Sequence, residues 1–247
     1  MRIFLNYLVL LIFLIGCNQS NNLSLENIKL ENKSCENCPL VIINIPKATE
    51  KDRISDAINT GLQEEIIAEL TFDEEDEVAD IEDAINSFIS GYRDIQKKHP
   101  EEVAAWEARI NAVVSYEDRQ MITIKLDTYL FTGGAHGYGA TRFLNFNKNK
   151  GSEIEDWELF IDKEDFVRFA ENKFRKQEKI PKDESINSTG YMFERDSFYL
   201  PENIGFTREG IKLLYNQYEV ASYAAGPIEL VLPYKEVKKY LSGEIKS

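Results

Sequence analysis

Three cysteines offer the most distinctive chemistry in this chain, and the first of them ends an apolar N-terminal run. Residues 14–17 read Leu-Ile-Gly-Cys, after Arg2 and the largely apolar residues 3–15. A bacterial lipoprotein signal has an apolar residue and then small residues before such a cysteine, because its thiol must reach a membrane-embedded lipid donor and a peptidase must then approach the same place. The run is shorter than the ~20 residues of a permanent membrane span. We therefore predict a cleaved signal peptide over residues 1–16 and lipid attachment at Cys17, which would place the protein in the cell envelope, on the extracytoplasmic side of a bacterial membrane. The alternative is a plain secretory signal that contains a chance cysteine.

Cys35 and Cys38 are the remaining pair, and two residues separate them. An exported protein folds where disulfides form, so we expect a disulfide that closes a small ring before the next strand. A redox-active pair is the alternative, but it requires a helix N-terminus to lower the pKa of the first thiol. Here Pro39 and the β-prone residues 40–43 follow instead. A zinc site would require further ligands, and the chain has only two histidines.

One of these histidines, His136, lies in the sequence Gly-Gly-Ala-His-Gly at residues 133–137. Adjacent glycines permit positive φ angles and the close approach of another chain. Catalysis at His136 would also require a nucleophile, an orienting carboxylate or a metal, and the sequence places none beside it. The 43 acidic residues are too many for a catalytic pair to be singled out. We therefore predict no catalytic residue, no metal site and no cofactor, and we interpret the loop as a sharp connection between strands.

The chain is strongly acidic, with a formal net charge of −14. Removal of residues 1–16 takes away Arg2 and leaves −15. Such a surface repels phosphate groups, so we expect no nucleic-acid partner, and we expect contact with the membrane only through the lipid anchor. A cationic partner would be favoured. The simpler interpretation is that the charge keeps an exported protein soluble.

Helical and strand periods follow one another along the chain. Apolar residues every three or four positions predict two helices, through Ile54, Ile58, Leu62, Ile66 and Leu70 and through Val78, Ile81, Ile85, Phe88, Tyr92 and Ile95. A short strand is expected before them at residues 40–45. Strict alternation over residues 106–116 and 122–130 predicts a long antiparallel hairpin, with a third strand at 142–146.

The rest of the chain predicts a second, smaller unit. A helix is expected at 162–178, short strands at 197–200, 211–215 and 228–232, and a closing helix at 234–241. This order indicates an α+β fold, with N-terminal helices packed on an antiparallel sheet and a second small α+β subdomain. The predicted parts are the signal peptide (1–16), a lipidated tether (17–38), an N-terminal α+β subdomain that includes the glycine loop (39–150) and a C-terminal α+β subdomain (151–247).

Three segments carry a resemblance to known extracytoplasmic domains. Residues 128–137 read Thr-Tyr-Leu-Phe-Thr-Gly-Gly-Ala-His-Gly, residues 198–200 and 209–211 read Phe-Tyr-Leu and Glu-Gly-Ile, and residues 218–227 read Tyr-Glu-Val-Ala-Ser-Tyr-Ala-Ala-Gly-Pro before Leu-Pro-Tyr at 232–234. Together they resemble the paired domains of unknown function in the lysozyme-sensing RsiV-type anti-sigma factors and in the accessory region of PdaC-type peptidoglycan deacetylases. The resemblance covers roughly residues 40–241. We find no counterpart here of the sigma-binding segment and membrane span of the former, or of the catalytic domain of the latter.

The resemblance implies an envelope location and a similar fold, and lysozyme binding is a property of particular members only. We predict a lipid-anchored, RsiV-like envelope binding module for a protein or a glycan related to peptidoglycan, and more specifically for a cationic muramidase such as lysozyme. The competing hypotheses are a cell-wall hydrolase or deacetylase-like enzyme that uses His136, and a scaffold within a larger envelope complex. The predicted ligand-binding residues are Gly133, Gly134, His136, Tyr138, Tyr218 and Tyr223.

Overall fold

The apolar periods of the N-terminal region become two helices, α1 (Arg53–Leu70) and α2 (Ile81–Lys98). An aspartate caps each helix: the side chain of Asp52 accepts a hydrogen bond from Ser55 N (2.9 Å), and that of Asp80 accepts one from Asp83 N (3.0 Å). These bonds satisfy backbone donors that have no partner within the first helical turn. Both predicted helices are therefore confirmed.

The computed structural model describes residues 23–32, 38–73, 75, 77–100, 104–243 and 245. The predicted signal peptide, the lipid attachment site Cys17 and Cys35 lie outside these residues. Cys38 is described, and it is disulfide-bonded. None of the helices in the described ranges combines the length and apolar character needed to cross a bilayer.

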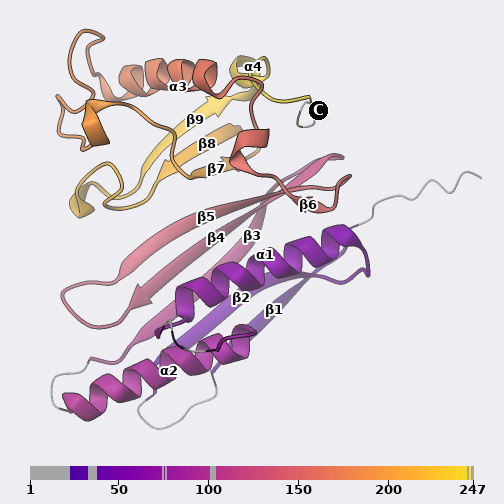
Figure 1. The fold of residues 1–247 in the computed structure, drawn as a ribbon, viewed down its shortest axis with the longest axis vertical. Helices are drawn as coiled ribbons and strands as arrows, with labels where there is room; N and C mark the ends of the chain where they lie inside the picture. Colours follow the sequence, from indigo (N-terminus) through magenta and orange to yellow (C-terminus); the bar gives the residue numbers. More distant parts are fainter. Residues whose placement is uncertain are drawn as a thin grey trace, which may run out of the picture.

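Figure 1 shows α1 and α2 on one face of a large sheet of six strands, in the order β1-β2-β3-β4-β5-β6. The strands are β1 (Leu25–Glu31), β2 (Leu40–Ala48), β3 (Glu107–Glu117), β4 (Met121–Phe131), β5 (Tyr138–Asn147) and β6 (Ser152–Glu153). Neighbours are antiparallel except β2 and β3, whose connection contains both helices and brings the chain back in the same direction. The α+β class and the hairpin of β3 and β4 are confirmed, but the sheet is mixed rather than purely antiparallel.

Two predicted boundaries of the N-terminal unit change. The predicted tether (17–38) includes residues 25–31, yet these form β1, which pairs with β2 along its whole length. Ile28 and Leu30 pack against the core beneath α1 and α2, and the polar residues of the strand are exposed, as an edge strand allows. At the other end, Ser152 and Glu153 form β6 against β5, so the second unit begins after residue 153 rather than at 151.

The second unit is a three-stranded antiparallel sheet of β7 (Asn203–Phe206), β8 (Gly210–Tyr215) and β9 (Ile228–Pro233). It is covered by α3 (Lys163–Glu178) and α4 (Tyr234–Val237), with short 3-10 turns η1 (Asp156–Glu158), η2 (Glu194–Asp196) and η3 (Tyr223–Ala225). The strand predicted at 197–200 is wrong: Phe198 is buried among the rings of Phe174 and Phe193, so its apolar character serves an aromatic core rather than a sheet. The closing helix is shorter than predicted, because the chain leaves it to pair Leu241 with Phe160.

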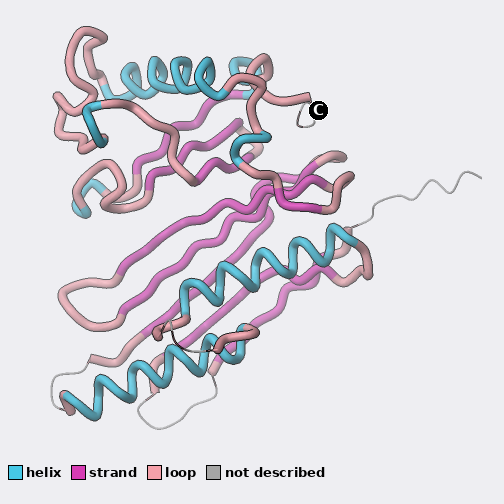
Figure 2. The backbone as a smooth tube through the Cα atoms, in the orientation of Figure 1, coloured by secondary structure: helices cyan, strands magenta, loops and turns pink. Residues whose placement is uncertain are grey.

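The two sheets face one another, and the helices form the outer layers (Figure 2). β7 lies across the inner face of the large sheet, where polar side chains hydrogen-bond to its backbone. Asn145 donates to Ile204 O (2.7 Å) and accepts from Thr123 Oγ1 (2.8 Å), while Ser115 donates to Phe206 O (3.0 Å). Because Thr123 and Asn145 are buried, these bonds fix the two units relative to each other.

Candidate functional site

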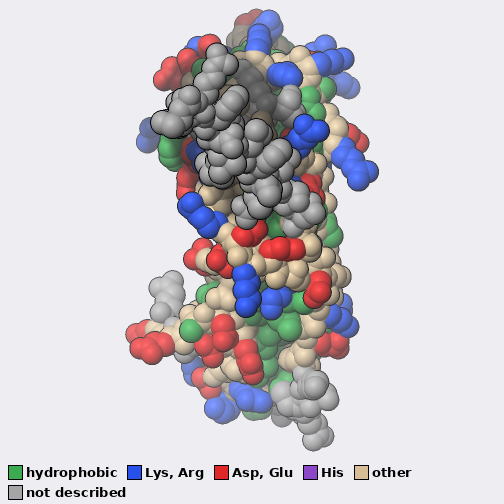
Figure 3. Space-filling model, turned by 90° about the vertical axis from the view of Figure 1, so that its right-hand side faces the viewer, with side chains coloured by type: hydrophobic (Ala, Val, Ile, Leu, Met, Phe, Trp, Pro, Cys, Tyr) green, Lys and Arg blue, Asp and Glu red, His purple; other side chains and the backbone are tan. Residues whose placement is uncertain are grey.

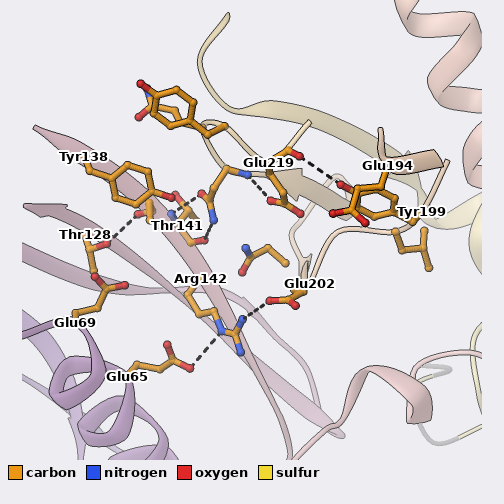
Figure 4. Close-up of a pocket in the computed structure, with 16 residues that line it drawn as sticks. Glu65, Glu69, Thr128, Tyr138, Thr141, Arg142, Glu194, Tyr199, Glu202 and Glu219 are labelled. Carbon is orange, nitrogen blue, oxygen red and sulfur yellow. Dashed lines mark hydrogen bonds and ion pairs between the residues drawn. The ribbon is translucent and has the colours of Figure 1, made fainter. Parts of the chain in front are cut away.

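The two units separate along the first half of β5, and a cleft opens between them. Its volume is about 810 Å³, which is within the usual range for a binding pocket. One wall comes from α1 and β5 of the N-terminal unit. The other wall comes from the segment before β7 and from residues 216–219, which follow β8. Figure 4 shows these walls, with labelled side chains from both units turned towards the same space.

The charge of this cleft is strongly unbalanced. Its lining holds five carboxylates, Glu65, Glu69, Glu194, Glu202 and Glu219, and a single cationic side chain, Arg142. Arg142 bridges the two walls: its Nε lies 3.3 Å from Glu65 Oε1 and its Nη1 lies 3.9 Å from Glu202 Oε2. Within the described part of the chain, no ion pair involves Glu69 or Glu219. The cleft therefore keeps negative charge that the protein itself does not neutralise.

Glu65 and Glu69 owe their position to the helical repeat. They stand four residues apart on α1, so they lie on the same side of the helix, while Leu62, Ile66 and Leu70 face the core. Burial raises the pKa of Glu69, and the negative charge of Glu65 raises it further. A nearby positive charge would oppose this rise in pKa, because it favours the ionised form.

The opposite wall is held by Asn216. Its side chain accepts a hydrogen bond from Thr141 N (2.9 Å) and donates one to Thr141 O (3.0 Å), as a neighbouring strand would do at this open edge of β5. Asn216 N donates to Glu219 Oε2 (2.8 Å), and Tyr199 Oη donates to Glu219 O (3.3 Å). Burial raises the pKa of Glu219, although the bond from Asn216 acts against this shift. The loop that carries Glu219 is thus attached to the N-terminal unit.

A buried acceptor completes the cleft. Asn203 is only 5% exposed, and it lines the cavity at the start of β7. Its Oδ1 has no hydrogen-bond partner among the described residues. Because a buried oxygen without a partner loses its hydration, a ligand that donates a hydrogen bond here would gain from it.

The predicted ligand-binding residues divide into three groups. Tyr138 and Tyr218 line the cleft. His136 and Tyr223 lie beside its rim: their rings are stacked with centroids 3.9 Å apart, and Tyr223 is 5.5 Å from Tyr218. Gly133 and Gly134 do not join them, but line a separate hollow together with His99 and Trp106. Both glycines have positive φ angles (103° and 88°), as expected for a sharp connection.

His136 is packed by its own loop and by the C-terminal unit. Its Nδ1 lies 3.1 Å from Gly137 O, and the hydroxyl of Tyr223 donates to the same carbonyl at 3.1 Å. These contacts tie the glycine loop to η3. Within the described ranges, no three His, Cys, Asp or Glu side chains are grouped as a metal site would need.

Sequence reasoning missed most of the cleft. Glu219 directly follows Tyr218 in the tyrosine-rich segment, and this position is the only feature of the sequence that points to Glu219 as a binding residue. Glu65 and Glu69 were two among many acidic residues on exposed helical faces. Arg142 and Asn203 become noticeable only when the two sheets are brought together.

Figure 3 shows one face of the molecule, where acidic side chains predominate over the middle and lower parts and basic ones are more frequent towards the top. The sequence agrees with this distribution. Residues 23–153 contain 25 acidic and 14 basic residues, whereas residues 154–247 contain 18 and 14. Most of the excess negative charge therefore belongs to the N-terminal unit, which carries one wall of the cleft.

The fold and the cleft define a class, an α+β protein of two units whose sheets face each other. Comparisons with known proteins support the predicted resemblance. Residues 29–138 match the family model described as deacetylase PdaC, and residues 158–235 match the family model of a protein of unknown function, DUF3298. Together the matches indicate an extracytoplasmic domain that has no characterised activity. The link to the RsiV-type anti-sigma factors stays a prediction.

Two crystal structures of DUF3298 family proteins share the fold. The one from Bacteroides fragilis is 20% identical, with 91% of this chain and 96% of that chain covered and a TM-score of 0.71. The one from Pseudomonas aeruginosa PAO1 is 21% identical, with 91% and 97% covered and a TM-score of 0.67. At this identity the likeness concerns the fold alone. No curated protein matches the chain.

Proposed function

We propose that this protein is an extracytoplasmic binding module that holds a cationic protein partner at the cleft between its two units. The observation that carries the proposal is the charge of the cleft, five carboxylates against one arginine. The rim adds Tyr138 and Tyr218, which are 40% and 56% exposed. Tyrosines supply contact area and cation–π contacts at protein interfaces, so this rim suits a partner rich in lysine and arginine.

The specific partner we propose is a cationic muramidase such as lysozyme. This choice comes from the resemblance to lysozyme-sensing domains, and the acidic cleft agrees with it. Opposite charges speed the encounter of two proteins and select against acidic competitors. The competing hypothesis of a hydrolase at His136 has no comparable support, because the contacts of this ring are with Tyr223 and the backbone of Gly137.

Calorimetric titration of the mature chain with lysozyme tests the proposal. We expect saturable binding at low salt that weakens by at least about tenfold when the ionic strength rises to 0.5 M, because screening shortens the reach of charge–charge attraction. Cytochrome c, a basic protein without muramidase activity, is the control. Binding of both proteins with equal affinity would contradict the muramidase assignment, and absence of lysozyme binding at low salt would contradict the cationic partner as well.

We further propose that Cys17 anchors the module in the envelope through acyl chains. β1 begins at Leu25, so only residues 18–24 separate the thiol from the sheet. Mass spectrometry of the N-terminal peptide from membranes is expected to show Cys17 as an acylated first residue. In the variant Cys17→Ser we expect loss of the acyl mass and release of the protein into the soluble fraction. An unmodified N-terminus on Cys17 in the wild-type protein would show the anchor to be wrong.

A further inference from the structure

Glu69 and Glu219 come from different units and line the same cleft. Glu69 projects from α1, Glu219 projects from the loop after β8, and both line the cleft (Figure 4). Tyr138 lines the cleft with them, and its hydroxyl has a pKa that is raised first by burial and then by the negative charges of Glu69 and Glu219. No ion pair in the described part of the chain neutralises either carboxylate, so each wall of the cleft keeps one negative charge.

The buried Asn203 gives this cleft a floor. Asn203 lines a cavity whose other side chains are mainly acceptors, and its Oδ1 is almost fully covered and has no hydrogen-bond partner among the described residues, so a ligand reaches this oxygen after a small turn of the Asn203 side chain. A ligand must therefore bring several hydrogen-bond donors and positive charge together. A metal ion is a poorer match, because no group of three ligating side chains forms among the described residues.

We propose that the cleft is a receptor for one arginine side chain of the partner, whose guanidinium lies between Glu69 and Glu219 and donates to Asn203 Oδ1. A guanidinium offers five N–H donors in a plane, so it can reach acceptors on two walls and the floor at once, and its faces can stack on tyrosine rings. Lysine has a compact charge and cannot span them in this way. The inference rests on the proposed function, because it names the group through which a cationic partner would engage this site.

The test uses N-acetyl-arginine methylamide as the probe and follows the amide spectrum of the mature chain by NMR. We expect saturable shifts at residues 216–219 with this probe, at least about fivefold weaker binding of the lysine analogue, and no shifts with the neutral citrulline analogue, which has nearly the same shape. Equal responses to arginine and citrulline would overturn the proposal. A lysine analogue that binds as tightly as arginine would overturn the guanidinium assignment.

Variants locate the subsite. The double variant Glu69→Gln/Glu219→Gln is expected to weaken probe binding at least about tenfold, and Asn203→Leu, which keeps the branched shape but removes the acceptor, at least about threefold. The control Glu77→Gln/Glu184→Gln removes the same charge from exposed residues that do not line the cleft, and it should change binding less than twofold. If the control and the cleft variants weaken probe binding equally, binding depends only on the net charge of the protein, and the proposal is wrong.

The same variants, titrated with lysozyme, separate this inference from the proposed function. If lysozyme binds and no cleft variant weakens its binding, the arginine subsite is wrong, and the cationic partner binds at another surface. Binding of the arginine probe without binding of lysozyme would support the arginine subsite and contradict the proposal that the partner is a muramidase. Loss of both in the wild-type protein would contradict both proposals.

Discussion

Replacing Gly205 by alanine is expected to lower the free energy of unfolding by about 2–3 kcal/mol, as overpacking of a filled core does. A Cβ on this β7 residue would lie 2.2 Å from the ring of Phe143. Phe143 is 6% exposed and lies on β5, so its buried ring must shift before a methyl group can fit. The close approach of β7 to Phe143 is therefore part of what holds the units at a fixed angle and keeps the cleft open.

A double-mutant cycle checks this reason. We expect Phe143→Leu to relieve part of the clash, so that Gly205→Ala/Phe143→Leu is at least about 1 kcal/mol more stable than the sum of the single changes predicts. Gly243→Ala is the control, because a Cβ there meets no atom within 4 Å. Urea unfolding followed by circular dichroism gives all four values. A neutral Gly205→Ala variant would show that the sheets are not in close contact at this point.

The affinity of the cleft for a cationic ligand is expected to fall about tenfold or more as the pH is lowered from 7.5 towards 4.5. A tenfold loss of affinity corresponds to a difference of about one pKa unit between the free and the ligand-bound carboxylates. Burial raises the pKa of Glu69 and of Glu219 above the ordinary value of 4.5 in the free protein. A bound cation favours the ionised carboxylates, so binding must release the protons that these groups hold. Affinity is therefore highest above the raised pKa values and is lost as the pH falls through them.

Neighbouring groups set the limits of this pH dependence. Glu65 adds to the shift of Glu69, and Glu202 adds to that of Glu219, while Arg142 pairs with both of these neighbours. Glu153, in an adjoining hollow, has a pKa raised to about 7 by burial and by Glu65. Calorimetry of the arginine probe across the pH range, in two buffers with different ionisation enthalpies, should show proton release. Glu69→Gln/Glu219→Gln should remove the dependence below pH 6, and Glu153→Gln should keep it. A flat profile in the wild-type protein would contradict the prediction.

Local sequence patterns predict most of the helices and strands of the N-terminal unit correctly. The repeats in α1 and α2 and the alternation in β3 and β4 each reflect contact with one continuous core, so period and structure agree. β1 escaped notice because it is an edge strand with few apolar residues. The strand placed at 197–200 was wrong because Phe198 and Tyr199 pack in an aromatic cluster between α3 and β8, where apolar residues need no sheet pairing.

The cleft was less accessible to sequence reasoning for a physical reason. Its walls come from segments about 75 residues apart, as the bonds between Thr141 and Asn216 show, and nothing local marks that meeting. The tyrosine-rich segment pointed to Tyr218 and Tyr223, but the glycine loop drew attention to Gly133 and Gly134, which lie at another hollow. Asn203 gains meaning only from burial without a partner, which is a property of the assembled fold.

Amide chemical-shift mapping of the isotope-labelled mature chain in the presence of lysozyme tests the central claim most directly. If a cationic partner engages the cleft, the largest changes will occur on both walls together, near Glu69 on α1, at Thr141 on β5 and at residues 216–219. Changes confined to α2 or to the outer face of α3, with these three regions unaffected at saturation, would contradict it.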